Sequence, residues 1–213
     1  MTNTNHRLEA FSDGVFAIAL TLLIIEIKIP PVSTVHSSKE LWLAFSHEWP
    51  SWLAFIVSFI TILISWVNHT HLMHLIDKSN PKFTYSNGLL LFFIIIIPFP
   101  TAAVAEYLNT DFAQPASTIY CGACLLNNLA WYACQYTSLH PQSLYKSTVS
   151  LEKVNRTGKF VLFGTGLYLF TFMLSFWFPI LAFSIVAVSY MFWIILGISI
   201  REDRMLAGKQ ESL

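Results

Sequence analysis

Six apolar runs, each close to the roughly 20 residues that a helix needs to cross the core of a bilayer, divide this chain of 213 residues. The runs cover about residues 8–29, 49–71, 83–107, 115–136, 160–178 and 179–200. Only Trp177-Phe178-Pro179 separates the fifth run from the sixth, so these two should form a tight helical hairpin. We therefore predict an all-α membrane protein with six transmembrane helices.

Composition favours a bilayer over water for the same chain. Hydrophobic residues make up 55% and charged residues only 11%, whereas a soluble domain is about 25% charged. Twelve basic residues balance twelve acidic ones, a balance that by itself argues neither for nor against nucleic acid, and we expect no such partner. The odd set of Cys121, Cys124 and Cys134 in one apolar stretch indicates packing residues, and a redox or metal pair at Cys121 and Cys124 is the weaker alternative.

The distribution of lysine and arginine predicts the orientation of the helices, because cytoplasmic loops are enriched in these residues. With six crossings, one side of the membrane carries ten of the twelve basic residues: Arg7, Lys78, Lys82, Lys146, Lys153, Arg156, Lys159, Arg201, Arg204 and Lys209. The opposite side carries only Lys28 and Lys39. We therefore expect a multi-pass protein of the cell (plasma) membrane with both termini in the cytoplasm. Residues 1–200 should form one transmembrane domain, followed by a short cytoplasmic tail, 201–213.

The first run holds two carboxylates, Asp13 and Glu26, in or at the edge of its apolar part. Carboxylates inside a membrane are costly and usually face protein or water, although Glu26 beside Lys28 can equally be solvated at the outer interface. At about 100° per residue, aliphatic side chains align in one narrow stripe on this helix: Ile18, Leu22, Ile25 and Ile29. Asp13 lies nearly opposite and should face neighbouring helices. On geometry alone, the stripe suits a lipid-facing or core surface better than a pore.

The second run returns toward the cytoplasmic side, so its last turns share the depth of Asp13. These turns carry Trp66 and His69, and either side chain can reach Asp13 or Ser12 with a hydrogen bond. We interpret this set as a polar clamp that positions the first helix. The simpler alternative is that Ser12 and Asp13 only serve the N-terminal end of a helix, where acidic residues suit the macrodipole.

The pattern Arg7-x-x-x-Phe11-Ser12-Asp13, which opens the first of the six runs, resembles the transmembrane protein 175 family of potassium channels. The likeness continues through the following apolar residues to Glu26. The resemblance implies a potassium-favouring cation channel and not an enzyme. A chain with one copy of the motif is implied to form a homotetramer in which the first helix of each subunit lines a central pore. The implied partners are other copies of this chain, the lipid bilayer and permeant potassium ions, with no cofactor or metal.

The resemblance also implies roles for individual residues. Ile18, Leu22 and Ile25 are implied to form the pore constriction, and Thr21 is implied to favour potassium. Trp66-x-x-His69 matches the family's pattern as well, and a structural network is implied for the motif residues: Arg7, Phe11, Ser12, Asp13, Trp66 and His69. Glu26, near the outer end of the helix, would attract cations to the outer mouth. The chain lacks a Thr-Val-Gly-Tyr-Gly filter, so we expect a hydrophobic constriction that gates by excluding water.

Other functions compete with the channel. A proton- or sodium-coupled secondary transporter could use Asp13 and Glu26, but such proteins usually show interrupted helices or repeats, whereas no Pro or Gly interrupts residues 15–29 and no repeat is visible. A structural or assembly factor would show no flux, and no nucleophile–base pair indicates an intramembrane enzyme. His69, His71 and His74 share one helix face poorly, which disfavours a metal site. Helix packing accounts best for the remaining polar and small residues: Asn127, Asn128, Gln135, Gly164 and Gly166.

Overall fold

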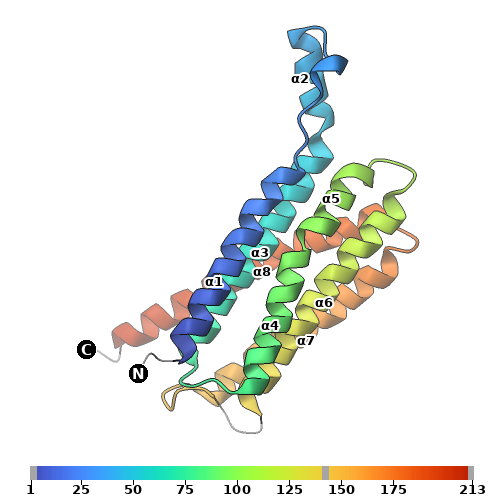
Figure 1. Ribbon diagram of the computed structural model, residues 1–213. Coiled ribbons are helices and arrows are strands. Elements are labelled where there is room, and N and C mark those ends of the chain that lie inside the picture. The colour runs from blue at the N-terminus through green and yellow to red at the C-terminus, as the bar shows by residue number, and fades with distance from the viewer. Residues whose placement is uncertain (1–3, 141–143, 211–213) are drawn as a thin grey trace.

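The computed structural model describes residues 4–140 and 144–210, and at residues 4, 151, 153 and 196–210 it describes the backbone alone. Figure 1 shows a helical bundle from which one short helix projects. The elements are α1 (Thr4–Leu22), η1 (Leu23–Glu26), η2 (Val32–Thr34), α2 (Ser38–His47), α3 (Trp49–Leu75), α4 (Pro81–Ile96), α5 (Pro98–Tyr107), α6 (Ala113–Leu139), α7 (Leu151–Leu174) and α8 (Pro179–Gln210). Over the described ranges the chain is therefore all-helical, as predicted, apart from an isolated bridge between Ile76 and Tyr145.

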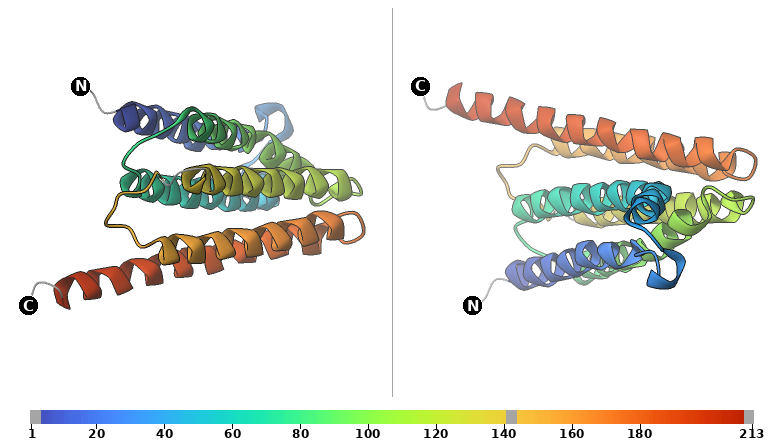
Figure 2. Two further views of the ribbon diagram at one scale, coloured as in Figure 1. Left: turned by 90° about the horizontal axis from the view of Figure 1, so that it is seen from below. Right: turned by 90° about the horizontal axis from the view of Figure 1, so that it is seen from above.

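The long helices lie in three layers, which Figure 2 shows from below and from above. α1 and α4 form one outer layer, α3 and α6 form the middle layer, and α7 and α8 form the other outer layer. Contacts between α1 and α3, α4 and α6, and α6 and α7 join the layers. The arrangement places α1 and the α7–α8 pair on opposite sides of the middle layer.

The first helix is shorter than its apolar run. The α-helical part of α1 ends at Leu22, four residues of 3₁₀ helix follow in η1, and Ile27 is extended with φ −81° and ψ 109°. The prediction of one helix to residue 29 is therefore wrong at its outer end. The extended end of the run has a local cause, since the residue before Pro30 avoids α-helical dihedrals.

The third apolar run is broken near its middle. Ile97 separates α4 from α5, because Pro98 and Pro100 lack the N–H groups that would continue the helical ladder. Thr101 resumes the ladder in α5, because it donates to the Ile97 carbonyl through both its backbone N–H (3.1 Å) and its hydroxyl (2.7 Å). Residues Pro81–Tyr107 remain long and apolar enough as a whole to cross a bilayer.

The short helix α2 follows the extended segment after η1 and was not predicted. Its start has a sequence signal, because Ser37 accepts a hydrogen bond from the Glu40 N–H at 3.2 Å, as N-capping serines do. In Figure 1, α2 projects beyond the ends of the other helices, away from both termini. The segment between η1 and α3 therefore contains folded structure.

The helices of the structure indicate the number of membrane crossings less clearly than the six apolar runs of the sequence do. By length and composition, four stretches of the described residues are able to cross a bilayer: Asn5–Glu26, Trp49–Leu75, Pro81–Tyr107 and Val154–Leu174. α6 has 27 residues but includes four amide side chains, and the apolar helical stretch Pro179–Ile195 of α8 is shorter. α8 continues through Gln210, into the segment predicted as a tail, of which residues 211–213 lie outside the described residues.

The packing of α7 against α6 and α8 depends on Gly164. A Cβ atom at this position would lie 2.9 Å from Asn128 Nδ2 and 3.1 Å from Trp193 Cζ2, whereas a Cβ at Gly166 would meet nothing within 4 Å. The close-packing role is therefore confirmed for Gly164 and not found for Gly166.

Gly164→Leu should lower the stability of the protein, because overpacking of a tight contact costs about 1–3 kcal/mol. We expect a clear fall in the thermal unfolding temperature of the purified protein, followed by intrinsic fluorescence. Gly166→Leu is the matched control and should leave this temperature nearly unchanged. Equal shifts in the two variants would show that the contact at Gly164 does not limit the packing of α7.

Candidate functional site

A buried hydrogen-bond network holds the inner half of α1 against α3 and α4. Asn87 of α4 donates from Nδ2 to Ser12 Oγ of α1 at 3.0 Å, and its Oδ1 lies 2.7 Å from His69 Nε2 of α3. An amide oxygen only accepts, so His69 donates through Nε2. All three side chains are at most 1% exposed. Buried polar groups that bond to one another in this way fix the relative positions of three helices.

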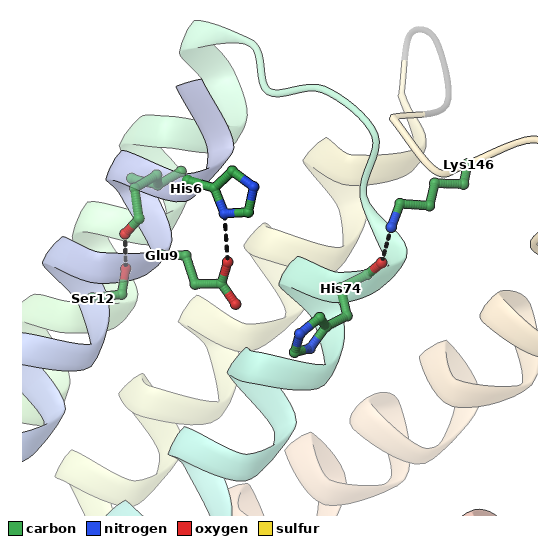
Figure 3. A network of polar contacts seen from close by, with 6 residues as sticks. His6, Glu9, Ser12, His74 and Lys146 are labelled. Carbon is green, nitrogen blue, oxygen red and sulfur yellow. Dashed lines mark hydrogen bonds and ion pairs between the residues drawn. The ribbon is translucent and has the colours of Figure 1, made fainter. Parts of the chain in front are cut away.

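Ser12 serves this network from within α1. The Ser12 hydroxyl, drawn in Figure 3, donates to the Leu8 carbonyl at 2.8 Å, which leaves its oxygen lone pairs available to Asn87. On the same end of the helix, His6 Nδ1 and Glu9 Oε2 lie 3.8 Å apart. Figure 3 also shows Lys146 donating to the His74 carbonyl at 2.7 Å, a bond that ties the loop after α6 to the end of α3.

Asp13 forms a second, more exposed link between α1 and α3. Trp66 Nε1 donates to Asp13 Oδ1 at 2.9 Å, one of the bonds that the shared depth of the two segments predicted. The other predicted partner, His69, reaches Ser12 only through Asn87. Sequence reasoning missed Asn87, although a lone amide early in an apolar run, at the depth of Ser12, is a signal of interhelical bonding.

Apolar contacts complete the buried face of α1. Ser12, Phe16, Ala19 and Leu23 follow one another at helical spacing and are all buried. The Phe16 ring lies 5.4 Å from the His69 ring, centroid to centroid. This face is the one that α1 presents to the bundle.

The predicted aliphatic stripe lies on the exposed side of α1. Ile18 is 61% and Ile25 69% exposed in the subunit, and Leu22 is exposed as well. Because η1 has about three residues per turn, Ile25 comes directly above Leu22 rather than to one side of it. Thr21 is exposed beside the stripe, and its hydroxyl donates to the Ile18 carbonyl at 2.9 Å.

Two motif residues lie apart from the hydrogen-bond network. Arg7 and Phe11 are exposed on α1, on the side of the stripe. The structure therefore brings Ser12, Asp13 and their partners on α3 and α4 together, and it leaves Arg7 and Phe11 on an open face of the subunit.

The outer end of α1 is tied to α5 by an ion pair that the sequence did not predict. Lys28, just after η1, pairs with Glu106 near the end of α5. The hydrogen bond and the charge of Glu106 raise the pKa of Lys28 above its usual 10.5. Both side chains are well exposed, and such pairs contribute little to stability. Glu26, which is partly buried, lies two residues before this pair.

Known proteins resemble this chain in sequence over the helices described above. The family described as "Endosomal/lysosomal potassium channel TMEM175" matches residues 7–98. A protein named potassium channel from Chamaesiphon minutus is 41% identical over 170 residues, which cover 80% of this chain and 83% of that protein. Another potassium channel, from Streptomyces collinus, is 43% identical over 119 residues, which cover 55% of this chain and 56% of that protein.

A solved structure shows the same fold. The crystal structure of a lysosomal potassium-selective channel TMEM175 homolog from Chamaesiphon minutus superimposes with a TM-score of 0.82 at 37% identity, covering 91% of this chain and 97% of that one. The likeness extends well beyond the motif on α1, to nearly all of the helices.

Proposed function

Since this chain belongs to the TMEM175 family of potassium channels, we propose that it is a potassium-favouring cation channel whose pore is lined by α1 of each subunit. The observation that carries the proposal is the two-sided character of α1. One face is buried in the bundle and fixed by hydrogen bonds, while the opposite face exposes the stripe of Ile18, Leu22 and Ile25. An apolar surface of this kind suits a symmetric assembly around a central axis.

The proposed assembly is a homotetramer with six crossings per subunit, formed by α1, α3, α4–α5, α6, α7 and α8. An even number of crossings places both termini on one side, and Figure 1 shows both described ends of the chain at the same end of the bundle, which supports an even count. The excess of basic residues on that side supports a cytoplasmic location for both termini in the plasma membrane. Residues 1–200 form the channel domain in this proposal, and α8 extends from it toward the tail, 201–213.

The proposed constriction consists of three rings of aliphatic side chains, from Ile18, Leu22 and Ile25. Rings of this kind close a pore to ions by excluding water, without a plug. The position of all three side chains on the exposed face of α1 supports this role.

Thr21 is the proposed selectivity residue. It is exposed beside the stripe, and donation of its hydroxyl hydrogen to the Ile18 carbonyl leaves the oxygen lone pairs free to accept. Four such oxygens around an axis would replace part of the hydration water of a cation. Glu26, one turn farther out, would raise the concentration of cations at the outer mouth. Potassium is then the permeant ion, and no cofactor is needed.

The motif residues are proposed to position α1. Ser12, Asp13, Trp66 and His69 belong to the contacts that fix it to α3 and α4. Two further residues, Arg7 and Phe11, lie on the open face and would make their contacts with neighbouring subunits.

Ion flux into liposomes tests the proposal. The purified full chain is reconstituted into potassium-loaded liposomes, and passive potassium flux is compared with sodium flux and with protein-free liposomes. We expect passive flux in which potassium exceeds sodium, and four chains per particle by light scattering. Flux that requires a proton or sodium gradient would favour a coupled transporter instead, and an absence of flux would favour a structural role.

A further inference from the structure

A groove of about 190 Å³ lies between the end of α6 and the start of α7, at the end of the bundle that holds the termini. α6 lines it with residues spaced four apart, and α7 lines it with residues of one helix face: Tyr132, Tyr136 and His140 from α6, and Asn155, Lys159 and Leu162 from α7. Within the described part of the chain, α1, α3 and α8 contribute nothing to its lining. The groove is therefore distinct from the proposed pore.

The two helices approach each other closely at the base of this groove. Gln135 and Gly158 line it there, and a Cβ atom at Gly158 would lie 3.2 Å from Gln135 Nε2. Gln135 is buried and donates through Nε2 to the Val154 carbonyl of α7 at 3.0 Å. This bond joins α6 to α7 under the groove, so the two walls hold a fixed separation.

Stacked rings form the wall on α6. The ring centroids of Tyr132 and Tyr136 lie 6.4 Å apart with 29° between the planes, and those of Tyr136 and His140 lie 4.6 Å apart with 17°. Eight residues of helix make this column about 12 Å long. Rings that combine an apolar body with a polar tip are typical of the interface between lipid and water.

The groove offers hydrogen-bond donors to an anion. Lys159 and Asn155 are both exposed, and no Asp or Glu is among the described residues of the lining. His140 Nδ1 donates to the Tyr136 carbonyl at 3.2 Å, so its neutral ring has no hydrogen left for a ligand. The ammonium of Lys159 and the amide of Asn155 are thus the groups that would meet a phosphate.

Depth separates the polar part of the groove from its apolar part. Lys159 lies five residues inside Val154–Leu174, a stretch able to cross a bilayer, which is about 8 Å along the helix. A lysine at this depth extends its ammonium to the level of the lipid headgroups. Leu162 and Tyr132 lie deeper, at the level of acyl chains. A phosphate ion alone would use only the outer half of this surface, whereas a phospholipid matches both halves.

We propose that the groove binds an anionic phospholipid of the leaflet on the side of the termini. Its phosphate accepts hydrogen bonds from Lys159 and Asn155, and one acyl chain lies along Tyr132, Tyr136 and Leu162. Basic pockets between membrane helices on the cytoplasmic side bind such headgroups. The site goes beyond the proposed channel, and its occupancy does not depend on potassium flux.

Photolabelling with a lipid tests the site. The full chain is placed in phosphatidylcholine nanodiscs that contain phosphatidylglycerol with a diazirine in its acyl chain, and adducts are mapped by mass spectrometry after irradiation. We expect saturable adducts near Tyr132 and Leu162. Excess phosphatidylglycerol should prevent them, whereas equal amounts of phosphatidylcholine or of glycerol phosphate should not.

Variants of α7 identify the cation. Lys159→Gln should lower the apparent affinity for phosphatidylglycerol by roughly fivefold, the effect of one basic residue at an anionic surface, and Lys159→Arg should retain it. Arg156→Gln is the matched control, because it removes an exposed charge of α7 that does not line the groove, and it should label like the wild type. Equal losses in Lys159→Gln and Arg156→Gln would show a diffuse attraction to a charged face and overturn the proposal.

Tyr136→Ala tests the wall without a change of charge. Tyr136 is 53% exposed, so its truncation leaves the bundle intact, but it interrupts the stacked rings and should weaken labelling. Labelling unchanged in this variant, or prevented by glycerol phosphate, would contradict a lipid site. An absence of adducts on both helices would assign the groove to a contact between subunits.

Discussion

Replacement of Ile18 by alanine is expected to raise passive potassium flux through the reconstituted protein by roughly tenfold, which corresponds to a barrier lowered by about 1.4 kcal/mol. Four shortened side chains would widen one apolar ring of the proposed constriction and admit water to it. The substitution is well suited to the test, because Ile18 is 61% exposed in the subunit and its truncation leaves no cavity in the bundle. The measurement is potassium efflux from loaded liposomes, normalised to the amount of reconstituted protein.

Ile119→Ala is the matched control for this experiment. Ile119 is an exposed isoleucine of α6, away from α1, and its truncation should leave flux unchanged. Equal flux from wild type, Ile18→Ala and Ile119→Ala would exclude the stripe on α1 as the barrier to ions.

Asn87→Leu should have the largest effect on stability and assembly among substitutions of the hydrogen-bond network. Leucine has nearly the same volume but removes the acceptor of His69 and the donor to Ser12. A buried imidazole N–H left without a partner costs about 1–3 kcal/mol, and Ser12 loses a bond as well. We expect a fall of several degrees in the unfolding temperature, fewer tetramers by light scattering, and a loss of potassium flux.

Trp66→Phe provides the comparison for Asn87→Leu. It removes one hydrogen bond to Asp13, at a site that is partly exposed in the subunit and not fully buried like Asn87, so the unpaired group should cost less. Its unfolding temperature should stay close to that of the wild type. If Asn87→Leu were no more destabilising than Trp66→Phe, the buried network would not be what holds α1 in place.

The faces of α1 were predictable, because a single helix sorts its own residues. The angle of about 100° per residue separated Ile18 and Leu22 from Asp13 on the helix. The depth of the second apolar run identified Trp66 as a partner of Asp13. Asn87 was not predictable in the same way. A lone amide carries no periodic pattern, and its two partners come from helices that only the tertiary fold brings together.

The ends of the helices far from the termini were harder to predict, because short-range features of the sequence determine them. Hydropathy does not distinguish the α-helix of α1 from the 3₁₀ turn of η1, since the two segments are equally apolar. Pro98 and Pro100 indicate the break between α4 and α5. The apolar run is nevertheless long enough for one crossing, so its length alone predicts a single helix. The Ser37–Glu40 cap likewise signalled α2.

The change from α-helix to 3₁₀ helix at Leu23 also sets the spacing of the proposed rings along the pore. Four residues of α-helix from Ile18 to Leu22 rise about 6 Å, and three residues of 3₁₀ helix from Leu22 to Ile25 rise about 6 Å as well. The rings would therefore be evenly spaced, with the Thr21 hydroxyls as the polar groups between the first and the last. A column of water entering this pore would be interrupted over about 12 Å, so an ion would have to shed much of its hydration water for that whole distance.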